Sequence, residues 1–301
     1  MLPSGCSALS MNDSFSLSAY QRACAVETSK SLDGSRLHFQ ILFVDDDNAK
    51  GRIAEGLLAR VAEHNDAMFV LFPASATIAS SRNAPRDAAA PEDAVKICES
   101  LGLCSTRCTM IGTSFDLSYL DEYDLIVAMD EDIRSLILRS LPHADQEYYS
   151  PRCRLLSEFL SPEFCKINNA KKETILLNML DSELFGRVAP LSDSITDRSS
   201  NVFFTDQGEA ALILASAGLT RFCLDTIDVQ FEASFQSLLQ ANIGRNPRLQ
   251  ADWDLADEQL RRCSAAITGY FSPAQRKTRF EEYLRNLRLQ EEEETKNDSI
   301  E

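Results

Sequence analysis

The sequence predicts an α/β fold in three layers, with a parallel sheet flanked by helices and a helical C-terminal extension. Short apolar runs at 37–44, 68–72 and 124–129 have the length of buried strands, and patterns of helical spacing separate them. Strands that alternate with helices in this way pair in parallel. Beyond residue 240 the clearest pattern is a helix from Pro273 onward, which indicates the extension.

Residues at the ends of the apolar patterns set the bounds of the expected strands and helices. The first strand stops at the acidic run 45–47, and apolar residues then recur at helical spacing over 49–63. Pro91 suits the first turn of a helix, and Gly102 suits the position after its last turn. The other expected elements are a strand at 68–72, a polar loop at 77–91, a short helix at 114–120, strands at 124–129 and 153–160, a helix at 133–141, a long helix at 209–239 broken at Gly218, and a helix that begins at Ser272-Pro273.

Three regions are expected along the chain. Residues 1–36 hold nine serines and few charges, so they form a disordered or targeting leader. A targeting leader would be a plastid or mitochondrial one; we expect plastids, and the alternative is the cytoplasm. The α/β domain spans 37–240 with an insertion near 161–206, and residues 241–301 form a helical extension with an acidic tail.

The composition excludes several classes of function. Thirty Lys and Arg residues against 46 Asp and Glu residues give a net charge of −16. A surface this negative repels phosphate backbones, so we expect no nucleic-acid partner and favour a protein partner with a basic surface. We find no apolar run of about 18 residues, so no membrane span is predicted. The nine cysteines have scattered spacings that favour free, mostly buried thiols.

The loop after the first strand is the natural place for a functional site. Ligands of open parallel sheets bind beyond the carboxyl ends of the strands, where a helix N-terminus offers N–H groups to an anion. In this chain the loop 45–52 reads Asp-Asp-Asp-Asn-Ala-Lys-Gly-Arg, so carboxylates stand where a phosphate needs donors. Without a ligand, Asp47 or Asn48 would cap the next helix. The candidate residues are Asp45, Asp46, Asp47, Asn48, Lys50 and Arg52 in the loop, and Asp130 after the strand at 124–129.

Two partial resemblances to known families would give these aspartates a role in metal binding or phosphate transfer. The string 41–47 resembles the start of a response-regulator receiver domain, but Asp130 comes too late in the chain to be its phosphorylated aspartate. The same string resembles the first motif of haloacid dehalogenase-like phosphatases, in which Asp45 and Asp47 would bind Mg²⁺. Ala49 departs from that motif, and no later Gly-Asp-x-x-x-Asp motif is found. A magnesium-dependent phosphohydrolase therefore stays open as an alternative.

A third resemblance covers residues 38–160. Its strings are Asn48, Ile53-Ala-Glu55, Asn83-Ala-Pro-Arg-Asp87, Ser105-Thr-Arg107 and Tyr123-Asp-Leu-Ile-Val-Ala-Met-Asp130, of which the last is the most specific. In this order they resemble the low-molecular-weight protein tyrosine phosphatase family, whose closing helix the helix at 209–239 resembles. The resemblance implies that family's three-layer fold, with its phosphate-binding loop at 45–52.

The residues that would carry this family's chemistry are changed. The resemblance puts the nucleophilic cysteine at Asp45 and the phosphate-binding arginine at Lys50 or Gly51, and Arg52 is the other cation within reach. The family's general acid belongs to an Asp-Pro pair, which this sequence lacks. A carboxylate in place of a thiolate, and a lost bidentate arginine, both work against phosphotyrosine hydrolysis.

The leading hypothesis is a phosphatase-like protein that has lost tyrosine phosphatase activity and serves as a binding, scaffold or regulatory protein. It needs no cofactor. The alternative, a phosphohydrolase that uses Asp45 and Asp47, needs Mg²⁺. In a third possibility the protein is a regulatory subunit, and residues 161–301 form its contact surface.

Overall fold

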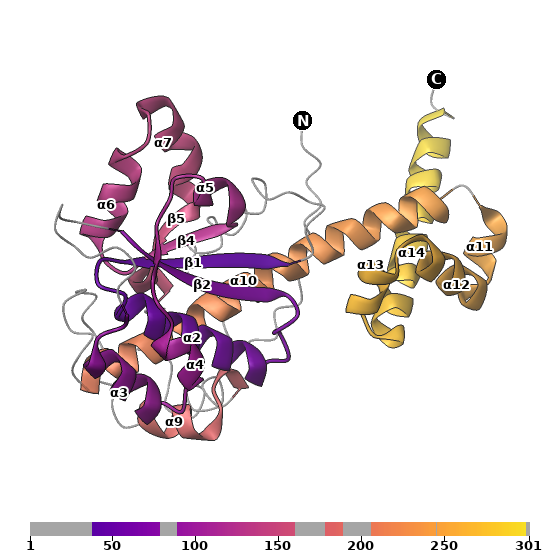
Figure 1. Ribbon diagram of the computed structural model, residues 1–301. Coiled ribbons are helices and arrows are strands. Elements are labelled where there is room, and N and C mark those ends of the chain that lie inside the picture. The colour runs from indigo at the N-terminus through magenta and orange to yellow at the C-terminus, as the bar shows by residue number, and fades with distance from the viewer. Residues whose placement is uncertain (1–37, 79–88, 160–177, 189–205, 245, 299–301) are drawn as a thin grey trace. The chain divides into compact units, whose positions relative to one another are not determined.

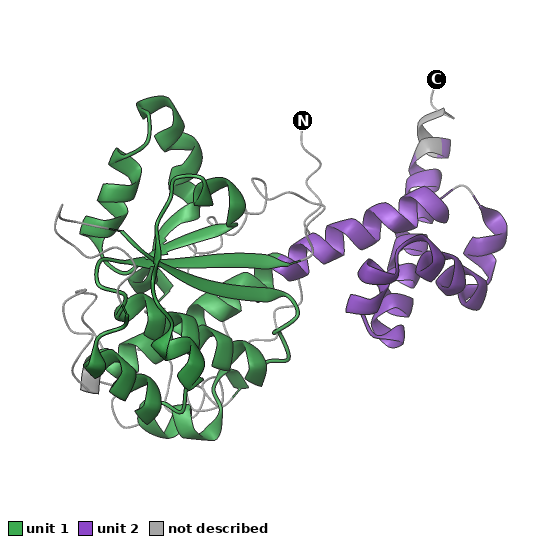
Figure 2. Ribbon diagram, viewed as in Figure 1, with its two compact units in different colours: residues 1–226 green, residues 227–301 purple. Residues whose placement is uncertain are grey.

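The computed structural model describes residues 38–78, 89–159, 178–188, 206–244 and 246–298. The chain divides into two compact units, residues 1–226 and 227–301, each described here by itself (Figure 2). The predicted leader (1–36), the string 83–87 and most of the predicted insertion (161–206) lie outside the described residues. The predicted domain bounds at 37–240 and 241–301 stay predictions.

Unit 1 is built on a five-stranded sheet in the order β3-β2-β1-β4-β5, and all neighbouring strands are parallel (Figure 1). The strands are β1 (Phe39–Asp45), β2 (Leu71–Thr77), β3 (Thr113–Ser114), β4 (Leu125–Ala128) and β5 (Cys153–Leu155). Between them lie α2 (Lys50–His64), α3 (Glu92–Ser100), α4 (Ser105–Thr109), α5 (Tyr119–Glu122), α6 (Glu131–Arg139) and α7 (His143–Tyr149). This arrangement confirms the predicted α/β fold class.

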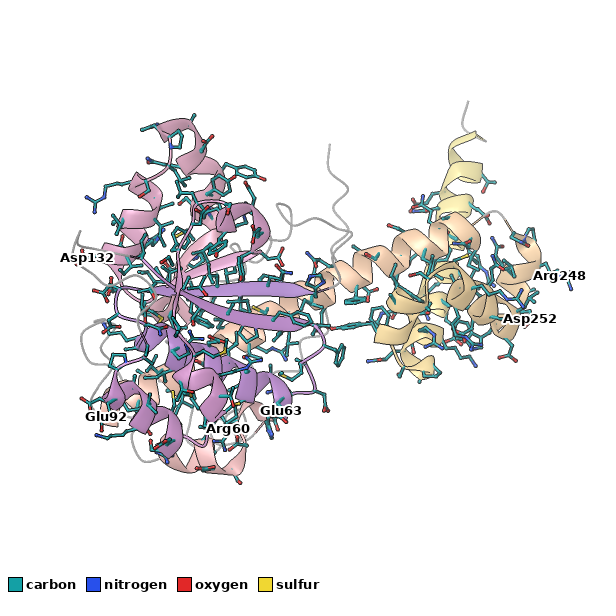
Figure 3. All side chains as sticks on the ribbon, viewed as in Figure 1. Arg60, Glu63, Glu92, Asp132, Arg248 and Asp252 are labelled. Atoms are coloured by element: carbon teal, nitrogen blue, oxygen red, sulfur yellow. The ribbon has the colours of Figure 1, made fainter. Side chains whose placement is uncertain are left out.

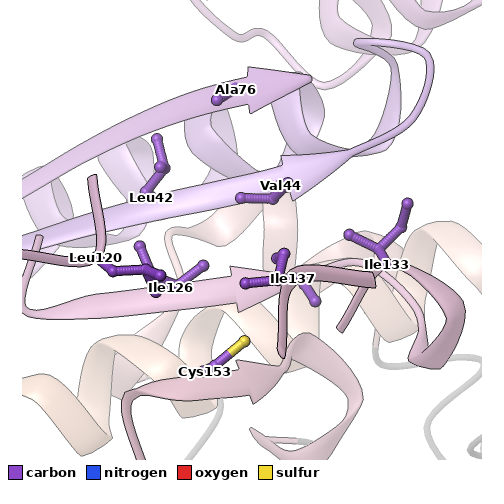
Figure 4. Close-up of a cluster of buried hydrophobic side chains, with 9 residues drawn as sticks. Leu42, Val44, Ala76, Leu120, Ile126, Ile133, Ile137 and Cys153 are labelled. Atoms are coloured by element: carbon purple, nitrogen blue, oxygen red, sulfur yellow. The ribbon is translucent and has the colours of Figure 1, made fainter. Parts of the chain in front are cut away.

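Both faces of the sheet are buried. Leu42 and Val44 of β1 pack with Ile126 of β4 and with Ile133 and Ile137 of α6 in one cluster of buried side chains (Figure 4). Because side chains alternate along a strand, the next residues of β1 face the opposite side, where α2 packs against β1 and β2 (Figure 1). This burial on both faces fixes the strand register, so the carboxyl ends of β1 and β4 meet at one edge.

Three strand and helix predictions in unit 1 were wrong in their bounds. The second strand begins at Leu71, because the backbone N–H groups of Val70 and Leu71 bond back to the carbonyl oxygen of Ala67 in a turn. The helix expected at 114–120 is instead the end of β3 followed by the short α5, which begins at Tyr119. β5 stops at Leu155, where the chain enters the 3₁₀ turn η2 (Leu156–Phe159).

The break predicted at Gly218 does not occur. Helix α10 (Asp206–Asn242) runs without interruption through Gly218. A Cβ on this residue would overlap the backbone carbonyl oxygen of Phe159, and the ring of Phe159 packs against Phe222 one turn later. Glycine stands here because another backbone approaches the helix closely, which a sequence pattern cannot separate from a helix stop.

Arg60 joins α2 to α9 (Ser182–Val188) in unit 1 (Figure 3). Its Nε lies 2.6 Å from Oδ2 of Asp181, and its Nη2 lies 2.8 Å from Oε2 of Glu183. Arg60 also donates to the carbonyl oxygen of Leu101, beside Gly102 at φ +61°. The predicted Gly102 stop of α3 is therefore confirmed and tied to the neighbouring helices.

Unit 2 is helical, as the predicted extension requires. It contains the last part of α10, α11 (Pro247–Ala251), α12 (Trp253–Cys263), α13 (Ala265–Tyr270) and α14 (Pro273–Asp298). The buried Arg276 donates to Asp257 from Nε at 2.7 Å and from Nη2 at 3.1 Å, and this pair joins α14 to α12. Residues 291–293 are exposed residues of α14, which begins at Pro273 and ends at Asp298.

One described helix, over Gly208–Asn242, is long and apolar enough to cross a membrane by length and composition. Of its most apolar stretch of 18 residues, 78% is buried inside the protein. The core helix of a protein without any membrane span passes the same test, so the expectation of no membrane span stays a prediction.

Candidate functional site

The loop between β1 and α2 lies at the carboxyl edge of the sheet, where the sequence places the site. β1 ends at Asp45 and α2 begins at Lys50. Asn48 is buried and has φ 57°, a left-handed conformation that turns the chain back toward the sheet. The turn directs the backbone N–H groups of the loop and of the first helical turn toward the end of β1.

The carboxylate of Asp45 occupies these N–H groups itself. Its Oδ1 accepts from the backbone N–H of Asn48 at 3.0 Å, and its Oδ2 accepts from that of Gly51 at 2.8 Å. Asp45 is 2% exposed, and burial raises the pKa of its carboxyl to about 7, against the two N–H bonds that lower it. A Cβ on Gly51 would stand 3.2 Å from this carboxyl, so the small residue and the carboxylate fit each other.

Asp46 and Asp47 lie on the outside of the loop and are exposed. Partial burial raises the pKa of the Asp46 carboxyl, and the negative charges of Asp47 and Asp130 raise it further. Asp130 is the N-cap of α6, where its Oδ1 accepts from the N–H of Ile133 at 2.9 Å. The structure therefore brings three of the candidate aspartates together at the outer face of the loop.

The expected capping of α2 by Asp47 or Asn48 was wrong. Ala49 is the N-cap and has no side-chain acceptor to offer, while Oδ1 of Asp47 accepts from the N–H of Ala49, before the helix begins. The acceptor for the first helical turn is Asp45, because it bonds to the N–H of Gly51. The N-terminus of α2 is thus satisfied by a residue of the preceding strand.

Arg52 is buried and engaged within the protein. Its Nη1 donates to Oε2 of Glu55 at 2.9 Å, and its Nη2 donates to Oδ1 of Asn48 at 3.3 Å. The hydroxyl of Ser75 donates to the same Glu55 oxygen at 2.7 Å, and Nη1 of Arg107 lies 3.7 Å from Oε1 of Glu55. The Arg52 guanidinium therefore helps to hold Asn48 in its left-handed conformation.

The Mg²⁺ ligand pair expected at Asp45 and Asp47 stays a prediction. Both oxygens of Asp45 already accept backbone N–H groups, and one oxygen of Asp47 does the same, so the carboxylates face donors rather than a cation. Among the described residues there is no group of three or more His, Cys, Asp and Glu side chains that could hold a metal ion.

The chain is similar to several solved structures at low sequence identity. No family model matches the chain, and no curated protein matches it. A protein tyrosine phosphatase from Entamoeba histolytica, with Hepes in its active site, is similar at 16% identity and a TM-score of 0.42 over 64% of this chain and 97% of that one. A low-molecular-weight protein tyrosine phosphatase from T. tengcongensis is similar at 19% identity and a TM-score of 0.33 over 47% and 92%. The YwlE arginine phosphatase is similar at 19% identity and 0.32 over 54% and 100%.

The fold defines the structural class of this protein. It is an α/β protein with a five-stranded parallel sheet flanked by helices, and it is similar at low identity to these phosphatases. At these TM-scores the likeness says nothing about the loop, so the chemistry of the site depends on the contacts given above.

Sequence reasoning placed the loop correctly but missed the residues beneath it. Glu55 and Ser75 complete the buried network of Arg52, and neither stood among the candidate residues. The signal was present in the sequence: Arg52 and Glu55 are spaced by three residues beside the apolar positions of α2. A pair of opposite charges at that spacing inside an apolar stretch indicates a buried ion pair.

Proposed function

We propose that this chain is a phosphatase-like protein without tyrosine phosphatase activity, which acts as a binding, scaffold or regulatory protein. The observation that supports it is the placement of the Asp45 carboxylate on the N–H groups of Asn48 and Gly51. A phosphate would need those same donors, and it would meet a negative or bulky carboxyl group in their place. The Asp45 carboxyl group therefore occupies the place that a bound phosphate would take.

The remaining groups of the loop support the same proposal. A thiolate is the nucleophile that the resemblance expects, and residue 45 has no sulfur. Of the two positions that the resemblance gives to the phosphate-binding arginine, Gly51 has no side chain, and Lys50 lies near enough to Asp46 to lower the pKa of that carboxyl. The guanidinium of Arg52 already bonds to Glu55 and Asn48. Catalysis of phosphoryl transfer depends on positive groups aimed at the developing charge. In this loop the charges nearest the strand end are carboxylates.

The outer face of the loop favours a basic protein surface as the partner. Asp46 and Asp47 are exposed, and Asp130 is close enough to raise the pKa of Asp46. Lys or Arg side chains of a partner would relieve the repulsion between these carboxylates, and such contacts raise association rates in a salt-dependent way. The net charge of −16 adds a long-range attraction toward the same basic partner.

The anion part of the proposal is tested with orthophosphate. The full chain, Asp45→Ala and Asp46→Asn are compared by calorimetric titration with phosphate and by hydrolysis of p-nitrophenyl phosphate, with and without Mg²⁺. We expect phosphate binding only in Asp45→Ala, because that variant frees two N–H donors. Asp46→Asn is the matched control, since it removes one charge and frees none of the donors held by Asp45.

Two results would contradict the proposal. Metal-free hydrolysis by the natural chain at rates typical of tyrosine phosphatases would show that the loop still works as a catalyst. Hydrolysis that appears only with Mg²⁺ would instead support the metal-dependent alternative. The partner class is tested with an arginine-rich peptide, whose binding should weaken in Asp46→Asn/Asp47→Asn and stay unchanged in the charge-matched Glu291→Gln/Glu292→Gln.

A further inference from the structure

The second half of α14, in unit 2, presents an exposed face (Figure 1). At Phe280 the helix still packs against its neighbours, since the centre of this ring lies 5.2 Å from that of Trp253 in α12. Beyond Phe280 no described side chain of α14 is buried, and Leu289 is 52% exposed. Most helices depend on the packing of an apolar face for their stability. Leucines on this half of α14 therefore indicate a surface that another molecule covers.

A groove on this face combines leucines with charges of both signs. It is lined by Glu281, Leu284, Arg285, Arg288, Leu289 and Glu292. Lys277 is exposed and lies one turn before Glu281, so it extends the same face of the helix. Among the described residues, none of these charged side chains forms an ion pair, although several of them are four residues apart. Their charges are therefore available to a second molecule.

The order of charges along this groove is complementary to itself when it is reversed. Two α14 helices can lie antiparallel with Glu281 of one copy opposite Arg288 of the other. One turn further out, Lys277 then stands opposite Glu292. Two-fold symmetry repeats each contact at the other end of the pair. In a parallel pair, by contrast, every charge would face the same charge on the other copy.

The middle of the antiparallel pair is apolar. Leu284 is half-buried and lies beside the two-fold axis, opposite Arg285 of the other copy. The methylene groups of an arginine can cover a leucine while the guanidinium stays in water. Leu289 lines the same groove and loses exposed surface with it. Burial of the leucines supplies affinity, and the ion pairs set the antiparallel direction.

We propose that α14 is the contact surface for a second copy of this chain, in an antiparallel pair of helices centred on Leu284 and Arg285. The occupant is a second copy because the face complements itself, whereas a purely basic or purely acidic partner would match only half of its charges. The proposal goes beyond the proposed function, because it concerns unit 2 and uses no residue of the loop. One helix face per copy is a small interface, so we expect a reversible dimer with a dissociation constant on the order of 10 μM.

The test measures the dissociation constant of the full chain by sedimentation equilibrium over a series of concentrations. At a salt concentration of about 0.15 M the Debye length is about 8 Å, which screens the long-range repulsion between two chains of net charge −16. Glu281→Arg should raise the dissociation constant by roughly tenfold or more, because two ion pairs become two contacts between like charges. Glu282→Arg is the matched control, since it makes the same change at the next exposed residue, outside the groove.

A variant with exchanged charges makes the test decisive. In Glu281→Arg/Arg288→Glu, opposite charges face each other again, so the dissociation constant should return to within about threefold of that of the natural chain. A natural chain that stays monomeric at about 100 μM would overturn the proposal, and a different molecule would then cover this face. A dimer that responds equally to Glu281→Arg and Glu282→Arg would overturn it too, as would a dimer that the exchanged charges fail to restore.

Discussion

The substitution Asp45→Asn tests the electrostatics of the loop most directly. It keeps the size of the side chain but removes the ability of residue 45 to titrate. Burial raises the pKa of Asp45 from 3.8 in a free carboxyl to about 7 in the folded chain. The folded protein therefore holds a proton at pH values where the unfolded chain has released it.

The sign and size of the effect follow from these two values. Because the folded pKa is the higher one, protonated Asp45 stabilises the fold at low pH, and this stabilisation is lost as the pH rises toward and through 7. Between pH 5 and pH 8 the loss in the free energy of unfolding is about 3 kcal/mol from this residue alone. The Asn variant has no such loss, and contributions of all other groups cancel in the comparison.

The measurement is urea unfolding of both proteins at pH 5, 6, 7 and 8, followed by circular dichroism. The single tryptophan, Trp253, lies in unit 2, so its fluorescence reports that unit and separates its transition from that of unit 1. Parallel pH profiles of natural chain and variant would refute the raised pKa. A profile in which the natural chain gains stability over the variant from pH 5 to pH 8 would show that the N–H groups outweigh burial.

Three further predictions concern packing. Gly218→Ala should lower the free energy of unfolding of unit 1 by at least about 2 kcal/mol, because its Cβ overlaps the Phe159 carbonyl. Gly186→Ala in α9 adds a Cβ in open space and should stabilise unit 1 by roughly 0.5–1 kcal/mol. Asp130→Ala removes the cap of α6 and should cost about 1 kcal/mol in the same urea titrations. Arg276→Met removes two hydrogen bonds to Asp257, which keeps Arg261 at 3.0 Å as a partner, and should cost roughly 1–3 kcal/mol in the transition seen by Trp253 fluorescence.

The order of elements could be predicted because it depends on local patterns. Alternating strands and helices, the acidic end of β1 and the Gly102 stop were all visible in the sequence. The bounds of β2 and the continuity of α10 were not, because they depend on a turn at Ala67 and on the approach of the Phe159 backbone. The approach of Phe159 joins residues distant in the chain, on which a propensity pattern holds no information. The turn at Ala67 is local, but its residues 68–70 are apolar enough to resemble the start of a strand.

The same limit explains what could be predicted of the site. The sequence located three carboxylates at the loop and indicated that they conflict with phosphate binding. It also offered Asp45 and Asp47 as a pair that would bind one Mg²⁺. The strand ends at Asp45, and the left-handed Asn48 then turns the chain, so the two side chains meet different N–H donors.

The side chain of Asp45 and the absence of a side chain at Gly51 depend on each other. A helix N-terminus at the end of a strand presents unpaired N–H groups, which need an acceptor whether or not a ligand is present. Asp45 supplies that acceptor from within the chain, and residue 51 must then be small, because a Cβ would stand 3.2 Å from the carboxyl. An arginine side chain at position 51 and a carboxylate at position 45 therefore compete for the same space.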